Sequence, residues 1–314
     1  MAGAVIYLEL LAWIVLPLLV GVALQRRGAG RELARRALSI ALYACQTPIS
    51  MFALWVAQVR GESSALPLLV LTGWVATLGL WWRLSRGLRG APQRRGAFVA
   101  AMSMSNHGYT LLGFVALALY GEAGLAQATY AHFFALPYIL LFCFPLCRYF
   151  GLRGQLDFAS ALTENLRDPR VLVPLGAMLL GLTLNLCDVP RPELFGTVTR
   201  GLIWIGTALC GIAIGVIAKG ALLKRYWREN VASFLYRSTI YPVLYLLLAL
   251  AANLGPLDTR VLVLYGLVPS GLVANLAAMF FDLDSDLTSS LYLVGTALFF
   301  VITLPLFAVL AAVP

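Results

Sequence analysis

The chain contains ten apolar segments, most of them about 20 residues long, and no other feature constrains its fold as strongly. A helix of that length rises about 30 Å, the thickness of the hydrocarbon core of a bilayer. Because lipid offers the backbone no hydrogen-bond partners, segments of this kind must form helices. We therefore predict an all-α membrane protein with ten transmembrane helices. The predicted spans are Val5–Leu24, Leu38–Val56, Leu66–Trp82, Ala97–Tyr120, Ala126–Leu146, Val171–Leu186, Leu202–Ala218, Ser238–Leu254, Val261–Phe281 and Leu287–Val309.

The composition agrees with lipid as the main solvent of the chain. Hydrophobic residues make up 61% of it and charged residues only 12%, and the mean hydropathy is +0.86. A soluble protein carries about 25% charged residues. The first apolar segment has no basic residue before it, so we do not interpret it as a secretory signal. A soluble domain is excluded, and the lipid bilayer is a predicted partner.

The basic residues predict the orientation of the spans. The net charge of +9 would suit a nucleic-acid-binding protein if it were gathered on one surface. With the N-terminus outside, however, 19 of the 23 basic residues fall in inner loops, as the positive-inside rule requires. This bias favours ten spans over eight or nine, places both termini on the non-cytoplasmic side, and predicts no nucleic-acid partner. The inner residues are Arg26, Arg27, Arg31, Arg35, Arg36, Arg83, Arg86, Arg89, Arg94, Arg95, Arg148, Arg153, Arg167, Arg170, Lys219, Lys224, Arg225, Arg228 and Arg237, and the outer ones are Arg60, Arg191, Arg200 and Arg260.

The longest inner connection divides the spans into two groups of five. We predict a first five-helix repeat at 1–150, a cytoplasmic linker with a short interfacial helix at 151–170, and a second repeat at 171–314. Because each group has an odd number of spans, the second is inserted upside down relative to the first. The result is a 5+5 inverted repeat in which the fourth span corresponds to the ninth. The outer loops, such as Gly121–Leu125, are short.

The fourth and ninth spans each carry helix-breaking polar residues. Broken helices at membrane depth persist only where they are buried in protein or line a cavity. Corresponding breaks in two halves of a chain are typical of the binding site of a secondary transporter. The alternative is that both are ordinary kinks whose polar groups are satisfied by neighbouring helices. The candidate substrate-binding residues are Ser105, Asn106, His107 and Gly108 in the fourth span, and Pro269, Ser270, Gly271 and Asn275 in the ninth.

Other polar residues give weaker signals. His107 could carry a proton, although a lone histidine in a bundle is more often a packing residue, and His132 and Glu9 are weaker candidates still. Asp282, Asp284 and Asp286 lack the glycine and the terminal glutamate of a calcium loop, so we read them as a solvated inner loop. Motifs of intramembrane enzymes, such as HExxH and GxSxG, are missing from the sequence. We predict no catalytic residue, metal or cofactor.

Four stretches resemble the auxin efflux carrier family, within the bile acid/sodium symporter fold group. They are SNHGYTLLGFVALALYGEAGL, NLRDPRVLVPLGAMLLGL, GTALCGIAIGVIAKG and VPSGLVANLAAMFFDLDSDLTSSLYLVGTALFFVITLP. The resemblance implies a scaffold domain of spans one, two, six and seven, and a transport domain of spans three to five and eight to ten, in which the broken fourth and ninth spans cross beside the substrate. Asn106 and Gly108 match the family's first break, and Pro269 and Asn275 match its second. The proline that often follows the first break is missing from Leu112–Phe114.

The function implied by the resemblance is the transport or facilitated export of small organic anions by alternating access, in a plasma membrane (the inner membrane of a bacterium). The substrates would be mono- or dicarboxylates, either auxin-like or malonate- and malate-like. We expect Asn106 and the backbone around Gly108, Ser270 and Gly271 to bind the carboxylate with no lysine or arginine in the site. Sodium coupling has little support, because neither broken span contains a carboxylate. The alternatives are a sodium-coupled symporter and a non-transporting sensor, and a homodimer through the GxxxG motif Gly211–Gly215 is possible.

Overall fold

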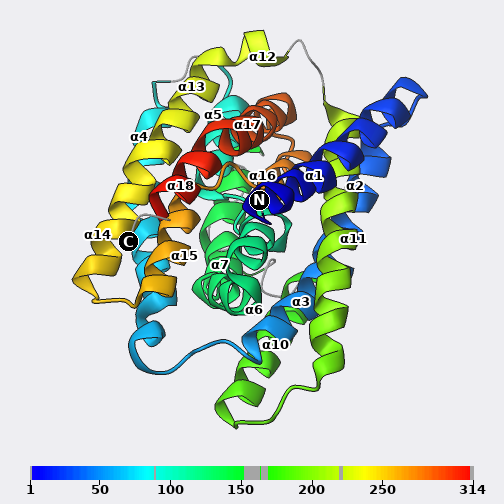
Figure 1. Cartoon of the computed structure of the whole chain (residues 1–314). Coiled ribbons are helices and arrows are strands. Elements are labelled where there is room, and N and C mark those ends of the chain that lie inside the picture. Colours follow the sequence, from blue (N-terminus) through cyan, green and yellow to red (C-terminus); the bar gives the residue numbers. More distant parts are fainter. Residues whose placement is uncertain (1, 88–89, 152–162, 164–168, 219–221, 312–314) are drawn as a thin grey trace. The chain divides into compact units, whose positions relative to one another are not determined.

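The computed structural model describes residues 2–87, 90–151, 163, 169–218 and 222–311, and its regular structure is helical (Figure 1). Among these residues, six helices are long and apolar enough to cross a membrane. They are Arg31–Leu54, Ser63–Ser85, Tyr109–Ala131, Glu193–Ile217, Trp227–Ala251 and Ser285–Val309. The prediction of an all-helical chain is confirmed, whereas the ten spans and their inverted repeat stay predictions.

The predicted linker at 151–170 lies outside the described residues, except for Gly151, Thr163, Pro169 and Arg170. The side chain of Glu9 also lies outside them, although its backbone belongs to the first helix. Neither prediction is tested here.

Contacts between residues divide the chain into two compact units, each built from three separate stretches. The boundary between Asn106 and His107 falls inside the predicted fourth span. Both units combine stretches from the two predicted repeats. Unit 1 is Met1–Gly61, His107–Tyr130 and Leu172–Ala218, and unit 2 is Glu62–Asn106, Ala131–Val171 and Lys219–Pro314.

In unit 1, the long helices α1 (Ala2–Arg26) and α11 (Glu193–Ile217) pack side by side (Figure 1). Glycines permit the close approach, because a Cβ built on Gly215 would lie only 2.2 Å from the carbonyl oxygen of Leu18. The GxxxG motif therefore packs α11 against a helix of the same chain. The other helices of unit 1 are α2 (Arg31–Ile40), α3 (Thr47–Leu54), α6 (Phe114–Ala131) and α10 (Pro169–Leu186).

Helix α6 turns sharply at Gly121. The residue has φ 66° and ψ −159°, a left-handed conformation that is strained for any residue with a Cβ. The predicted outer loop between the fourth and fifth spans starts at this residue. The apolar run from Tyr109 to Ala131 is thus two helical pieces joined at a glycine turn.

Unit 2 surrounds an aromatic core in which several polar tips are hydrogen-bonded. The hydroxyl of Tyr241 accepts a 2.7 Å hydrogen bond from Nε1 of Trp81, and the hydroxyl of Tyr265 lies 2.9 Å from Nδ1 of His132. His132 is therefore a packing residue of this cluster. The helices of unit 2 are α4 (Leu66–Ser85), α5 (Pro92–Ser103), α7 (Ala135–Tyr138), α8 (Phe144–Gly151), α12 (Leu222–Arg225), α13 (Trp227–Leu235), α14 (Tyr241–Ala251), α15 (Pro256–Leu267), α16 (Leu272–Phe280), α17 (Ser285–Leu298) and α18 (Leu304–Ala311).

Asp284 caps the N-terminus of α17. Its carboxylate accepts hydrogen bonds from the amide of Leu287 (3.1 Å) and from the hydroxyl of Tyr226 (2.9 Å). Burial, together with the hydrogen bond and charge of Asp284, raises the pKa of Tyr226, so the phenol stays a donor. The aspartate that we expected in a solvated loop has a defined role in starting a helix.

Several helices widen into a π-helical turn just before a proline. A proline ring clashes with the carbonyl four residues earlier and donates no hydrogen bond, so one extra residue in the preceding turn relieves the strain. The π-helical segments Ala41–Gln46, Ile139–Cys143, Tyr236–Ile240 and Phe299–Thr303 end two residues before Pro48, Pro145, Pro242 and Pro305 respectively.

Candidate functional site at two helix breaks

The first break separates α5 from the π-helical segment Tyr109–Gly113. Helix α5 ends at Ser103, Met104 has φ −109° and ψ 84°, and helical geometry returns only at Tyr109. The sequence predicted an interruption of the fourth span at these residues, and the interruption is confirmed.

The second break separates α15 from α16. Helix α15 ends at Leu267, and Val268 and Gly271 are both extended, with ψ 141° and 158°. Pro269 has no backbone N–H, so it cannot continue the hydrogen-bond ladder of α15. This break also lies where the sequence predicted it.

The two breaks pair with each other through their backbones. Ser105 and Ser270 form an isolated antiparallel bridge. The amide of Asn106 donates a 2.8 Å hydrogen bond to the carbonyl of Pro269, and the amide of Gly271 donates a 2.7 Å hydrogen bond to the carbonyl of Met104. Each break thus supplies partners for groups that the other leaves without a helical partner, as buried backbone requires.

Gly271 permits this close pairing. A Cβ built on it would lie 2.5 Å from the carbonyl oxygen of Ser105 and 2.7 Å from that of Met104. Both obstacles are backbone atoms, which cannot move aside without breaking the bridge. Glycine is therefore required at this position by the close packing of the two paired breaks.

Arg237 lies at both breaks, which corrects its assignment to an inner loop. It belongs to a π-helical turn within the candidate span 227–251 and is 3% exposed. One terminal nitrogen donates to the hydroxyl of Ser105 and, at 3.1 Å, to the carbonyl of Val268. The other donates to the carbonyls of Ala101 (2.9 Å) and Met102 (3.0 Å). An arginine that the sequence analysis placed in a loop therefore lies buried beside the paired breaks.

Two helix C-termini compensate the charge of this guanidinium. Its carbonyl partners lie at the C-terminal ends of α5 and α15, where carbonyls lack helical donors. Each such end carries the equivalent of about half a negative charge. Within the described part of the chain no carboxylate pairs with Arg237, so these two ends act as its counter-charge.

Two buried polar side chains at the second break each have a hydrogen-bonding group without a partner among the described residues. The hydroxyl of Ser270 is fully buried and has no hydrogen-bond partner among the described residues. One end of the Asn275 amide binds the hydroxyl of Ser289 (3.0 Å), and the other end has no partner in the same part of the chain. An unsatisfied buried group destabilises a fold, and a bound ligand is one of the reasons for which such a group persists.

A comparison with protein families matches residues 160–308 to the family described as membrane transport protein, which contains the auxin efflux carriers. The match covers just under half of the chain, and over these residues the chain is similar to that family. The resemblance seen in the sequence is thereby confirmed. Comparison with curated proteins gives no match.

The matched part of this membrane transport protein includes the second break and Arg237. The family is one of transporters rather than enzymes, and together with the apolar helices it supports an integral membrane location. The first break lies before the matched residues and is connected to them by the backbone bridge between Ser105 and Ser270.

The structure brings together only some of the predicted site residues. Ser105, Asn106, Pro269, Ser270 and Gly271 form the paired breaks, and Asn275 follows on α16. All six belong to unit 2.

His107 and Gly108 belong to unit 1 and are described there by themselves. The carbonyl of Gly108 accepts a 3.1 Å hydrogen bond from the amide of Gly113, and a Cβ on Gly108 would lie 2.9 Å from Oε1 of Gln46. Gly108 is thus packed against the elements of unit 1.

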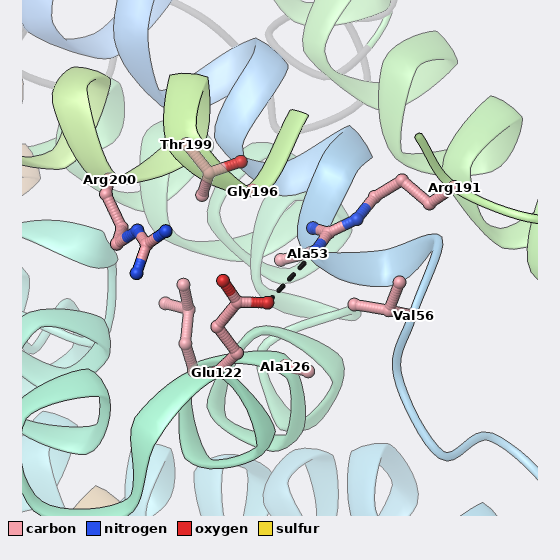
Figure 2. A pocket seen from close by; sticks show the side chains of 9 residues that line it. Ala53, Val56, Glu122, Ala126, Arg191, Gly196, Thr199 and Arg200 are labelled. Carbon is pink, nitrogen blue, oxygen red and sulfur yellow. Dashed lines mark hydrogen bonds and ion pairs between the residues drawn. The ribbon is translucent and has the colours of Figure 1, made fainter. Parts of the chain in front are cut away.

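Unit 1 contains a small charged pocket that the sequence did not predict (Figure 2). Arg191 donates a 3.0 Å hydrogen bond to Glu122 and a 3.1 Å hydrogen bond to the carbonyl of Phe52. Arg200 extends over the pocket from α11 (Figure 2). Arg191, Arg200 and Glu122 all come from regions predicted to face outside.

Proposed function

We propose that this membrane transport protein carries small organic anions across the membrane by alternating access, and that the paired helix breaks of unit 2 bind the carboxylate. The observation that carries the proposal is the pair of breaks joined by a backbone bridge, with unpartnered Ser270 and Asn275 groups buried beside it. Irregular backbone of this kind needs a reason to persist at membrane depth.

The charges at the second break suit an anion. Helix α16 starts directly after Gly271, so its N-terminal end, which carries a partial positive charge, begins at the break. The hydroxyl of Ser270 and the free end of the Asn275 amide can both donate hydrogen bonds. Arg237 neutralises the C-terminal ends of α5 and α15, so those ends do not repel an anion.

The proposed substrate-binding residues are those predicted from the sequence: Ser105, Asn106, His107, Gly108, Pro269, Ser270, Gly271 and Asn275. The substrate class is that of mono- and dicarboxylates, either auxin-like or malonate- and malate-like. Dipoles and amides, rather than a free cation, would hold such a substrate, which favours modest affinity and rapid release.

Transport would move the paired breaks as one body. The paired residues Met104–Asn106 and Pro269–Gly271, with Arg237, belong to unit 2, and backbone hydrogen bonds would keep them together during any movement relative to unit 1. We further propose the ten-span inverted repeat as the framework. Spans one, two, six and seven would form the scaffold, and spans three to five and eight to ten would form the transport domain.

The test is uptake of a radiolabelled dicarboxylate such as malonate into proteoliposomes. Wild type should exceed empty liposomes, and Asn106→Ala should lose most of that uptake. The control is Asn253→Gly, because Asn253 has φ 52°, a conformation that glycine adopts readily, and lies in the turn between α14 and α15.

Three outcomes would contradict the proposal in different ways. Equal uptake by wild type and Asn106→Ala would remove Asn106 from the site. No uptake of any mono- or dicarboxylate by folded protein would overturn the substrate class. A thermal shift with an organic acid but no flux would favour the sensor alternative.

A further inference from the structure

We propose that Arg237 is a built-in cation: its guanidinium takes the place between two helix ends that a bound metal cation would otherwise need to fill. The consequence is that the paired breaks keep their shape, and carry their substrate, without a dissociable coupling cation. This second part rests on the proposed function, whereas the first part is a property of the folded chain.

The atoms around Arg237 form a typical cation site. Three are backbone carbonyl oxygens, from Ala101, Met102 and Val268, and the fourth is the hydroxyl oxygen of Ser105. Hard cations such as Na⁺ are bound by carbonyl and hydroxyl oxygens of this kind, and unwound helices of transporters offer them at membrane depth. Here a side chain occupies the site instead.

The geometry assigns the two terminal nitrogens of Arg237 to the cage. A guanidinium has four hydrogens on its two terminal nitrogens, and each of these nitrogens makes two hydrogen bonds to the cage. All four terminal hydrogens are therefore used in the cage, and only the N–H on Nε has no partner among the described residues. On one side, Tyr241 also covers the charge, with its ring centroid 5.7 Å from the guanidinium carbon.

The charge balance points the same way. The two helix ends together offer the equivalent of about one negative charge, which one guanidinium cancels. An arginine at the middle of an apolar span is costly unless something of this kind offsets it. Because Arg237 is covalently attached, its charge cannot be released on either side of the membrane, so it cannot couple transport to an ion gradient.

The test compares cation responses of full-length wild type and Arg237→Ala. Thermal unfolding of the detergent-purified proteins is measured at equal ionic strength in choline, sodium and methylguanidinium chlorides. Wild type should unfold at the same temperature in all three salts. Arg237→Ala should unfold several degrees lower in choline and recover part of the loss in methylguanidinium or sodium.

The matched control is Arg228→Ala. Arg228 lies on the adjoining helix α13, is exposed, and stacks on Trp227. Arg228→Ala should unfold at the same temperature in all three salts. If Arg237→Ala does not fold, the pair Arg237→Lys and Arg237→Gln decides: the lysine variant should resemble wild type, and only the glutamine variant should respond to sodium.

Uptake provides the second measurement. Wild type should take up dicarboxylate equally in sodium and in choline, and methylguanidinium should restore part of the uptake of Arg237→Ala. The proposal is overturned if wild type needs sodium, or if the variants at Arg237 respond to cations no more than Arg228→Ala does. If wild type transports no organic acid, the proposed function fails, while the unfolding measurements still decide the role of Arg237.

Discussion

The amide of Asn106 donates a 2.8 Å hydrogen bond to the carbonyl of Pro269, which joins two helix breaks that lie far apart in the sequence. A reciprocal bond from Gly271 to Met104 completes the pair. The two breaks therefore form one structural element, and a change that separates them should affect both.

Gly271→Ala should disrupt this element. The added methyl group would meet the carbonyl oxygens of Ser105 and Met104 at 2.5 and 2.7 Å, and backbone atoms cannot move aside. Overpacking of this kind costs about 1–3 kcal/mol, and transport should fall in parallel. Thermal unfolding and uptake are measured against Gly79→Ala in α4, where a Cβ has nothing within 4 Å. Equal unfolding temperatures and equal uptake in the two variants would contradict the close contact between the paired breaks.

Ser270→Ala should separate stability from function. The Ser270 hydroxyl is buried without a partner among the described residues, and such a group destabilises a fold by about 1–3 kcal/mol. Its removal should therefore leave the unfolding temperature unchanged or raise it. Uptake should nevertheless show a higher KM, because the substrate loses a donor. Ser63→Ala is the contrasting variant: Ser63 donates to Asp258, so its loss should lower stability. Unchanged KM in Ser270→Ala would remove this hydroxyl from the site.

The breaks could be predicted from the sequence because their causes are local. Proline lacks a donor, and glycine tolerates extended backbone, whatever surrounds them. The turn at Gly121 was predictable for the same reason. The pairing of the breaks was not, because it depends on which backbone groups meet across the fold.

Arg237 shows where reading the sequence failed. It was counted with the basic residues of an inner loop, and the eighth span was predicted to start directly after it, at Ser238. The apolar residues Val231, Phe234 and Leu235 before it were a signal that the helix starts earlier. Three of its four partners are backbone carbonyls, which every residue possesses, so the amino-acid composition did not indicate them.

Gly215→Ala should weaken unit 1. The new methyl group would lie 2.2 Å from the carbonyl oxygen of Leu18, so α1 and α11 would have to move apart. We expect a loss of about 1–3 kcal/mol in the free energy of unfolding. Gly201→Ala, on the same helix with nothing within 4 Å of its Cβ, should be neutral or stabilising, because alanine favours helix. If both variants unfold alike, the close helix contact does not contribute to stability.

Glu122 and Arg191 form an ion pair (Figure 2), and removing one or the other should change the free energy of unfolding by unequal amounts. The Glu122 side chain is 47% exposed, so water and salt screen it, and Glu122→Gln should cost at most about 1 kcal/mol. Arg191 is 11% exposed and also donates to the carbonyl of Phe52 at 3.1 Å. Arg191→Gln should therefore cost more, because it leaves a carbonyl unpaired as well as a carboxylate.

Salt distinguishes these two contributions. Chemical or thermal unfolding is measured at 50 mM and 500 mM salt. The stability loss caused by Glu122→Gln should be smaller at the higher concentration, since the Debye length there falls well below 10 Å. The larger effect of Arg191→Gln should persist, because the bond to Phe52 has an uncharged, partly buried acceptor. A salt-independent loss of equal size in both variants would mean that the pair acts through its shape in the pocket, beside Thr199 and Arg200, rather than through its charge.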